Sequence, residues 1–340
     1  MNVLRLGFPV KVLGVPDLKS NDSRRWQSNP HLRVSLEYLD RIFDYLESRD
    51  ILMYRMSSDL APYATHPDMP QFHDMVRESP RELRNAGDRA RRIGLRLSFH
   101  PSQYIVLNSP DESLVQKSVS DVALQSEILD RMELGPEAVV VIHVGGAYGD
   151  RASGCERWIR TWERLPAHAR KRLVLENDDT RYGPADVLWI HERTGVRLIF
   201  DYQHWWCFNP ECVPLREALH RMLATWPGGV RPKIHFSSPR TEMRETTRRS
   251  RKTGKNETVL VPPLSTQHGD YANAFEFCTF MRDHAGAEFD VMLESKAKDL
   301  ALLRLRADMR RFAPDVAARF GIQAEAEVDL AIPATALPGE

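Results

Sequence analysis

The sequence has no long apolar run, few cysteines and no net charge. No stretch of about 18 apolar residues occurs, so we expect no membrane span. The beginning of the chain, MNVLRLGFPVKVLG, is too short and too interrupted by charge, glycine and proline to be a secretory signal. The four cysteines form no CxxC pair and are too few for a disulfide framework. These absences predict reduced thiols and a cytoplasmic location, associated with the nucleoid if the source is bacterial.

Charge is balanced overall but unevenly distributed. The 47 Lys and Arg residues equal the 47 Asp and Glu residues, which counts mildly against a polyanionic partner. The segment Arg240–Asn256, however, holds seven basic and two acidic residues and is predicted to be a polar loop. Gly321–Glu340 holds four acidic residues and no basic ones, which is typical of a disordered tail. We expect a catalytic domain over residues 1–315 and an acidic tail over 316–340.

Composition is that of a globular protein, with 42% hydrophobic and 28% charged residues in a chain of 340. Short apolar runs rich in β-branched residues alternate with longer amphipathic segments. The predicted strands are Val3–Pro9, Ile51–Ser57, Leu95–His100, Ala138–Val144, Arg172–Glu176, Val196–Asp201, Pro232–Phe236 and Phe289–Glu294. The predicted helices are Leu32–Leu46, Pro80–Ile93, Asp111–Leu134, Cys155–Leu165, Pro184–Arg193, Val213–Trp226, Tyr271–His284 and Lys298–Phe312.

Eight strand–helix pairs predict a single-domain α/β fold, a (β/α)8 TIM barrel. The basic segment would then be an insert before the eighth strand. Several strands are apolar almost throughout, as expected of parallel strands that are buried on both faces. An open doubly wound sheet is the second choice, and the absence of a glycine-rich phosphate loop after the first strand weakens it.

Residues of metal-ligand type stand at or near the ends of six successive predicted strands. They are His100, His143, Glu176, Asp201, His235 and Glu294, and His204 and His268 follow in the connecting loops. In a barrel these strand ends form one rim, where active sites lie. One such residue alone is more often a helix cap or a structural hydrogen-bonding group. Three carboxylates brought together would repel one another without cations, so the whole set indicates divalent metal ions.

The number and mixture of these residues restrict the chemistry. Imidazole mixed with carboxylate suits Mn²⁺, Zn²⁺, Fe²⁺ or Co²⁺ better than Ca²⁺ or Mg²⁺. Eight candidates exceed the four ligands of one closed site, so two or three ions that share carboxylates fit better, and such sites favour hydrolysis of phosphate esters. Lys233 shares a strand face with His235. It either has a low pKa, contacts a phosphate, is carboxylated to a carbamate, or lies beyond the cluster in solvent.

Eight motifs in order along the chain resemble the UV-damage endonuclease family. Its relatives are the endonuclease IV apurinic-site nucleases and the xylose-isomerase-like barrels. The motifs are YRMSSDLAPYATH (Tyr54–His66), FHPSQYIVLNSP (Phe99–Pro110), IHVGGAYGD (Ile142–Asp150), LENDD (Leu175–Asp179), DYQH (Asp201–His204), KIHFSS (Lys233–Ser238), HGDY (His268–Tyr271) and DVMLESKAKDLAL (Asp290–Leu302). Each motif is weak alone, but each stands where a barrel rim is expected.

The resemblance implies a cluster of three metal ions, with Mn²⁺ most expected and Zn²⁺ or Co²⁺ as alternatives. The eight residues above match the family's ligand positions, with Glu176 as the bridging carboxylate and Lys233 at the position of a modified lysine. We expect catalytic roles for Glu176, Lys233 and His235. Gln103 and Tyr104 match a pair that is inserted into the duplex opposite the flipped lesion.

The sequence departs from the family pattern at two places. Phe8 stands where we expect a tyrosine after Leu-Gly, so it keeps the ring of a lesion contact without the hydroxyl, and no asparagine follows before Asn21. The connection from His235 to His268 is longer than expected, by the basic segment.

These observations predict a metal-dependent DNA repair endonuclease. The resemblance to the UV-damage endonuclease family implies that it would nick damaged double-stranded DNA on the 5′ side of cyclobutane dimers and (6-4) photoproducts, leaving a 3′-hydroxyl and a 5′-phosphate, and the metal site implies attack by a metal-generated hydroxide. Residues of Arg240–Lys255 would hold phosphates. We expect a monomer with no obligate protein partner and no membrane. The alternatives are an apurinic-site endonuclease, a sugar isomerase or epimerase on the same barrel, and a DNA-binding protein with a structural metal, against which the excess of ligands argues.

Overall fold

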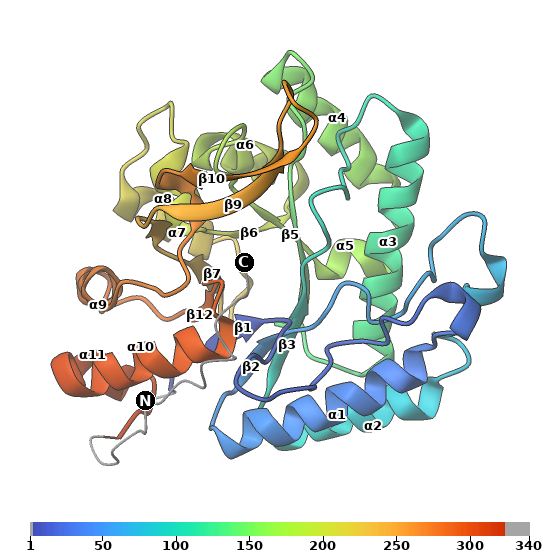
Figure 1. The fold of residues 1–340 in the computed structure, drawn as a ribbon, viewed down its shortest axis with the longest axis horizontal. Coiled ribbons are helices and arrows are strands. Elements are labelled where there is room, and N and C mark those ends of the chain that lie inside the picture. The colour runs from blue at the N-terminus through green and yellow to red at the C-terminus, as the bar shows by residue number, and fades with distance from the viewer. Residues whose placement is uncertain (1–2, 324–340) are drawn as a thin grey trace.

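Eight parallel strands form the centre of the computed structural model, which describes residues 3–323 (Figure 1). Every residue of β3, β5, β7 and β12 is buried, as the apolar runs predict. All eight predicted strands are confirmed, and each is shorter than predicted because ladder pairing does not extend to the ends of the apolar runs. They are β1 (Leu6–Pro9), β2 (Met53–Arg55), β3 (Arg96–Phe99), β4 (Val139–His143), β5 (Leu173–Glu176), β6 (Arg197–Ile199), β7 (Lys233–Phe236) and β12 (Asp290–Leu293).

The sheet curls into a barrel that closes between β6 and β7. The hydrogen-bonded strand order is β6-β5-β4-β3-β2-β1-β12-β7. A single parallel bridge between Asp201 and His235 joins the two ends, and the amide of His235 donates to the carbonyl of Phe200 at 2.9 Å. The (β/α)8 barrel prediction is therefore confirmed. Two of the candidate ligands stand on this closing seam.

Helices surround the strands, and each predicted helix is present. The principal helices are α1 (Leu32–Ser48), α2 (Pro80–Arg92), α3 (Glu112–Arg131), α4 (Arg151–Arg164), α6 (Pro184–Thr194), α8 (Leu215–Leu223), α9 (Ala274–Asp283) and α10 (Lys298–Phe312). The shorter ones are η1 (Trp26–Ser28), η2 (Pro70–Phe72), α5 (Ala167–Arg172), α7 (Tyr202–Cys207) and α11 (Pro314–Arg319). The start of α4 lies earlier than predicted, because the side chain of Asp150 accepts a hydrogen bond from the amide of Ala152 and caps the helix there. No helix within residues 3–323 has both the length and the apolar composition that a bilayer crossing requires.

The basic segment before the last barrel strand is not the loop that composition predicts. It folds into two antiparallel pairs, one of β9 (Arg244–Arg249) with β10 (Asn256–Val261) and one of β8 (Pro239–Arg240) with β11 (Leu264–His268). We refer to residues 239–268 as the ribbon. Threonines in both strands and two valines in β10 favour strand formation, and the charged residues suit an exposed β-ribbon. The prediction of an insert at this place is correct, and the predicted lack of regular structure is wrong.

The packed part of the chain continues past residue 315, where a tail is predicted. Residue 315 lies inside α11, and Phe320 and Ile322 are buried against the rest of the core. The apolar residues that follow α10 therefore belong to the barrel. Residues 324–340 of the predicted tail lie outside the described residues.

Helix α2 contacts the end of α3 too closely for any side chain at Gly87. A Cβ atom at Gly87 would lie 1.8 Å from the carbonyl oxygen of Met132. Helix propensity alone favours alanine over glycine by about 1 kcal/mol at such a position. The clash is with backbone, which cannot rotate away, so tertiary packing reverses the preference.

We predict that Gly87→Ala lowers the free energy of unfolding by about 1–3 kcal/mol. Urea denaturation followed by circular dichroism measures it. Gly228→Ala is the matched control, because no atom lies within 4 Å of a Cβ at that position. A stabilised Gly87→Ala variant would show that α2 and α3 do not meet in this way.

Candidate metal centre

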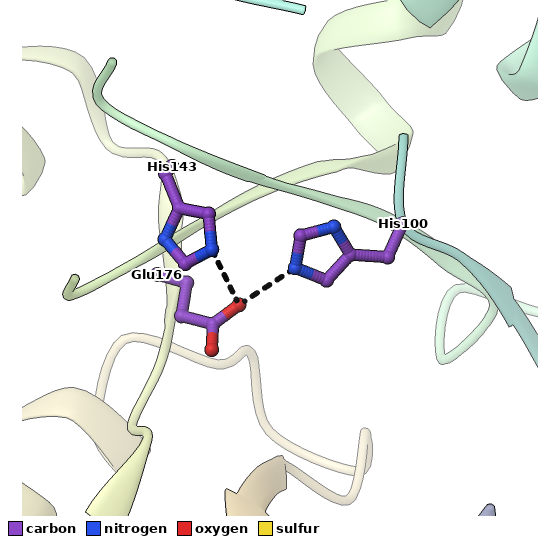
Figure 2. A group of neighbouring side chains, drawn as sticks. All are labelled: His100, His143 and Glu176. Atoms are coloured by element: carbon purple, nitrogen blue, oxygen red, sulfur yellow. Dashed lines mark hydrogen bonds and ion pairs between the residues drawn. The ribbon is translucent and has the colours of Figure 1, made fainter. Parts of the chain in front are cut away.

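One buried carboxylate stands among four imidazoles at the carboxyl ends of the strands. Glu176, the last residue of β5, is fully buried. Its Oε2 lies 3.1 Å from His100 Nε2 and 3.9 Å from His143 Nε2, and Figure 2 shows both rings directed at this one oxygen. Its Oε1 lies 2.8 Å from His235 Nδ1 and 3.5 Å from His204 Nδ1. The two carboxylate oxygens thus face side chains from four separate elements.

A second carboxylate, Glu294, extends the cluster beyond β12. Its Oε1 lies 3.3 Å from His235 Nδ1 and its Oε2 lies 3.7 Å from His268 Nε2. It also forms an ion pair with Arg55, the last residue of β2. Sequence reasoning assigned no role to Arg55, because only residues that bind metal were considered at the strand ends. Arg55 itself stands at the end of β2, and that position could have indicated a role at the rim.

Asp201 orients His204 through a helix cap. Asp201 precedes α7, and its Oδ1 accepts a hydrogen bond from the amide of His204 at 2.8 Å. Asn177 fixes both residues: its Oδ1 accepts from the amide of Asp201 at 2.9 Å, and its carbonyl oxygen lies 2.9 Å from His204 Nδ1. Asn177 follows Glu176 directly, and sequence reasoning gave it no role.

His268 reaches the cluster from β11 of the ribbon. Its Nδ1 lies 2.6 Å from Ser237 Oγ and 3.0 Å from Gln203 Oε1. These contacts direct its Nε2 toward Glu294. Hydrogen bonds that fix the far ring nitrogen are typical of histidines that bind metal. The structure thus brings all eight predicted ligands into one connected group.

Several polar atoms of the cluster are buried without a hydrogen-bond partner. They are His143 Nδ1, Asp201 Oδ2 and His235 Nε2. Such atoms are rare in folded proteins because each costs free energy when it leaves water. Three overlapping sets of ligand atoms lie within 4.8 Å of one another: His100 with His143 and Glu176, His100 with His235 and Glu294, and Glu176 with Asp201 and His204. The residues present therefore fit divalent metal ions.

Burial keeps most of these histidines in the neutral form that binds metal. It lowers the pKa of His100 to about 3, with the charge of Arg55 as the next cause, and it lowers that of His268 to about 4. The pKa values of His143 and His235 also lie well below the ordinary value because of burial. A neutral imidazole offers a free lone pair at neutral pH.

The pKa values of the three carboxyl groups are shifted in different directions. Burial raises the pKa of Glu176 well above its ordinary value, and the charges of Glu294 and Asp201 add to the effect. Burial likewise raises the pKa of Asp201 to about 6. Burial also acts to raise the pKa of Glu294, but Arg55 and the histidines lower it well below the ordinary value. Burial thus favours the protonated form of two of the three carboxyl groups, and a divalent ion would compete with those protons.

Lys233 lies inside the barrel beneath the cluster. It is fully buried, and its Nζ donates to Ser98 Oγ at 3.0 Å. Burial lowers its pKa well below the ordinary value, and the positive charges of Arg96 and Arg55 lower it further. The alternative of a lysine in solvent is therefore wrong. The lowered pKa agrees with the first alternative, and a phosphate contact and a carbamate stay predictions.

The predicted DNA-contacting residues divide into two groups. Gln103 and Tyr104 are exposed in the loop after β3, and 73% of Tyr104 is accessible to solvent. Both line a cavity of about 620 Å³ together with His100, His143 and Glu294. Phe8 is instead fully buried in β1, with its ring edge against Tyr54 at a centroid distance of 5.5 Å. The structure thus places Phe8 in the core and away from the surface of the cavity.

The comparison with known proteins now decides the family. The sequence model of the family described as UV-endonuclease UvdE matches residues 29–319. The chain belongs to this family. Members of the UvdE family are endonucleases, so DNA is the class of substrate.

Individual proteins that resemble this chain support the same family assignment. The UV DNA damage endonuclease of Bacillus pumilus (strain SAFR-032) is 38% identical over 259 residues, which cover 76% of this chain and 75% of that protein. The crystal structure of SacUVDE matches with a TM-score of 0.75 and 28% identity, over 91% of this chain and 98% of that one. A D-psicose 3-epimerase from Clostridium cellulolyticum H10, solved with D-tagatose, has a TM-score of 0.50 and 10% identity over 94% of this chain and 90% of its own. That likeness is one of fold alone, so membership of the UvdE family favours the endonuclease prediction over the isomerase.

We predict that Mn²⁺ raises the melting temperature more at pH 7.5 than at pH 5.5. The pKa of Asp201 is raised to about 6 in the folded chain, from roughly 4 when unfolded. Protonated Asp201 thus stabilises the metal-free protein at low pH, and this contribution is lost as the pH rises through about 6. A divalent ion replaces the proton, so its stabilising effect grows over the same range.

Differential scanning calorimetry at the two pH values, with and without saturating Mn²⁺, measures this effect. Asp201→Asn is expected to reduce both the gain and its pH dependence. The exposed Asp283→Asn should behave as wild type. An equal gain at both pH values in the wild-type protein would argue against a carboxylate site of this kind.

Proposed function

We propose that this chain is a metal-dependent DNA repair endonuclease that nicks duplex DNA on the 5′ side of UV photolesions, both cyclobutane dimers and (6-4) photoproducts. The observation that supports it most is the position of Glu176, whose two oxygens face four imidazoles at the barrel rim. Membership of the UvdE family supplies the class of reaction. The ions would be two or three in number, with Mn²⁺ expected and Zn²⁺ or Co²⁺ as alternatives.

The proposed ligands are His100, His143, Glu176, Asp201, His204, His235, His268 and Glu294. When bound, divalent ions withdraw charge from phosphate oxygens and lower the pKa of water. Glu176 lies between the other side chains, so it would bridge ions. In the incision, water attacks phosphorus and the 3′ oxygen leaves, which yields a 3′-hydroxyl and a 5′-phosphate.

Two further side chains complete the proposed catalytic group. His235 contacts both Glu176 and Glu294, so it would keep the two carboxylates apart at a fixed distance. Lys233 lies on the same strand face as His235, and its lowered pKa favours the neutral amine. A neutral amine is the form that adds carbon dioxide, and the resulting carbamate would offset part of the metal charge.

Recognition of the lesion is assigned to the loop after β3. Gln103 and Tyr104 stand at the mouth of the cavity that leads to the cluster. A photodimer is already poorly stacked and paired, so extrusion of the damaged nucleotides costs less there than in intact DNA. An exposed aromatic ring beside an amide would fill the gap and stack on the orphaned bases. Phe8 lies too deep for this role.

We predict that Glu176→Gln reduces incision of irradiated duplex by roughly 100-fold or more, since the bridging charge is lost. The measurement is a denaturing-gel nicking assay with Mn²⁺ on irradiated, abasic and intact duplexes that share one sequence. Glu37→Gln, which alters an exposed residue of α1, should retain full activity. Nicking at the wild-type rate by a folded Glu176→Gln protein would contradict the proposal. Cleavage of the abasic duplex alone by the wild-type protein would show that the lesion is an abasic site.

We predict that Gln103→Ala combined with Tyr104→Ala lowers the preference for irradiated over intact duplex by roughly 10-fold, as expected when base–aromatic stacking is lost. Metal content should stay at the wild-type value, because neither side chain contacts the cluster. Phe312→Ala removes an exposed ring at the end of α10, remote from the rim, and serves as the control. Unchanged selectivity in the double variant would remove the loop from lesion recognition.

A further inference from the structure

The cations of the ribbon fall into two groups with different surroundings. Near its base, Arg240 is buried and donates to Gln267 Oε1 and to the carbonyls of Glu242 and Pro262. Arg244 donates to both oxygens of Asp270. Arg240 thus holds the base of the ribbon together, and Arg244 joins the ribbon to the loop that follows it.

The other five basic residues crowd the distal end. Residues 248–257 hold five basic side chains, all exposed, and one acidic side chain: Arg248, Arg249, Arg251, Lys252, Lys255 and Glu257. Among residues 3–323, no ion pair joins any of these five cations to a carboxylate. The turn that carries them is ordered, because Ser250 donates to the carbonyl of Lys255 and Gly254 donates to that of Ser250. The result is a hydrogen-bonded turn at the tip of the ribbon with an excess of positive charge.

The ribbon starts at the proposed active site. It leaves the barrel after β7 and returns through β11, which ends in His268. In Figure 1 the β9–β10 pair lies above β1 to β3 and extends toward the top of the view. Five residue steps along β9 span about 17 Å. At 3.4 Å per base pair, the tip would stand roughly five base pairs from a phosphate held at the base of the ribbon.

We propose that the distal ribbon binds the phosphates of undamaged duplex DNA beside the lesion and supplies affinity that does not depend on the lesion. The inference rests on the proposed function for its partner. A two-stranded ribbon is narrow enough to lie in the major groove. Five exposed cations within ten residues place a dense positive charge at the tip, which is what a DNA backbone attracts. The tip carries no apolar side chain that would enter a bilayer.

Protection of an exposed strand edge is the competing explanation for these charges. Charged residues, lysine above all, discourage edge-to-edge pairing between protein molecules. Acidic residues would serve that purpose as well, yet the distal end holds five bases and one acid. The sign of the charge therefore favours an anionic partner. The experiment below separates the two explanations.

The test compares two triple variants that remove the same charges. The ribbon variant is Arg248→Gln with Arg251→Gln and Lys252→Gln. The control is Arg92→Gln with Arg170→Gln and Lys171→Gln, which alters exposed residues at the ends of α2 and α5 just before β3 and β5, at the opposite end of the barrel. Fluorescence anisotropy measures binding of irradiated and intact duplexes of one sequence between 50 and 200 mM salt.

The ribbon variant is expected to bind both duplexes at least about 10-fold more weakly at 50 mM salt, by the same factor for each. The slope of log K against log salt should fall in magnitude by about 2 to 3, one unit for each lost phosphate contact. The control variant should match the wild type. Unchanged affinity and slope in the ribbon variant would overturn the inference, and so would weakening confined to the irradiated duplex.

Other outcomes identify other roles. Self-association of the ribbon variant with unchanged DNA binding would assign the charges to edge protection. Weakened binding to vesicles of anionic lipid, with DNA binding intact, would assign them to a membrane surface. Because intact duplex needs no incision, a wild-type protein that cuts nothing, but whose ribbon variant loses duplex binding, defeats the proposed function and leaves this inference standing.

Discussion

The carboxylate of Glu176 sets the constraint on which the barrel rim depends. It is fully buried among imidazoles, and two further carboxylates lie beside it. Burial of a single ion costs several kcal/mol unless a partner of opposite charge compensates it. Within the described residues only Arg55 brings a cation directly to a carboxylate of the cluster, and that carboxylate is Glu294. The raised pKa values and the unpaired polar atoms follow from the same missing positive charge.

The opposite end of the barrel also buries a carboxylate, and there arginine side chains of the protein compensate its charge. Asp290, the first residue of β12, is fully buried and pairs with the equally buried Arg96 at 2.8 Å, while Arg5 approaches it from the surface. The carboxylate of this end thus has cationic partners from the protein itself. The carboxyl end has fewer such partners, which leaves it able to bind cations and substrate. Lys233 lies between the two ends, where neither provides its charge with a partner.

The sequence pattern was sufficient to predict the barrel and the place of the eight cluster residues at its rim. Both depend on local properties, namely the periodicity of apolar residues and the position of a residue at the end of a strand. The pattern failed where tertiary contacts decide. Nothing in the sequence near Phe8 tells a buried ring from an exposed one, and composition makes residues 240–256 read as a loop although cross-strand pairing makes them a ribbon. Arg55 and Asn177 were missed because their roles exist only through partners far along the chain, Glu294 and His204.

The most direct test of the central claim is anomalous diffraction from crystals of the full chain grown with Mn²⁺. We expect two or three anomalous peaks, each within coordination distance of at least three of the eight residues, with Glu176 adjacent to more than one peak. The absence of any peak near Glu176 at full Mn²⁺ occupancy elsewhere would contradict the claim that the cluster is a metal centre.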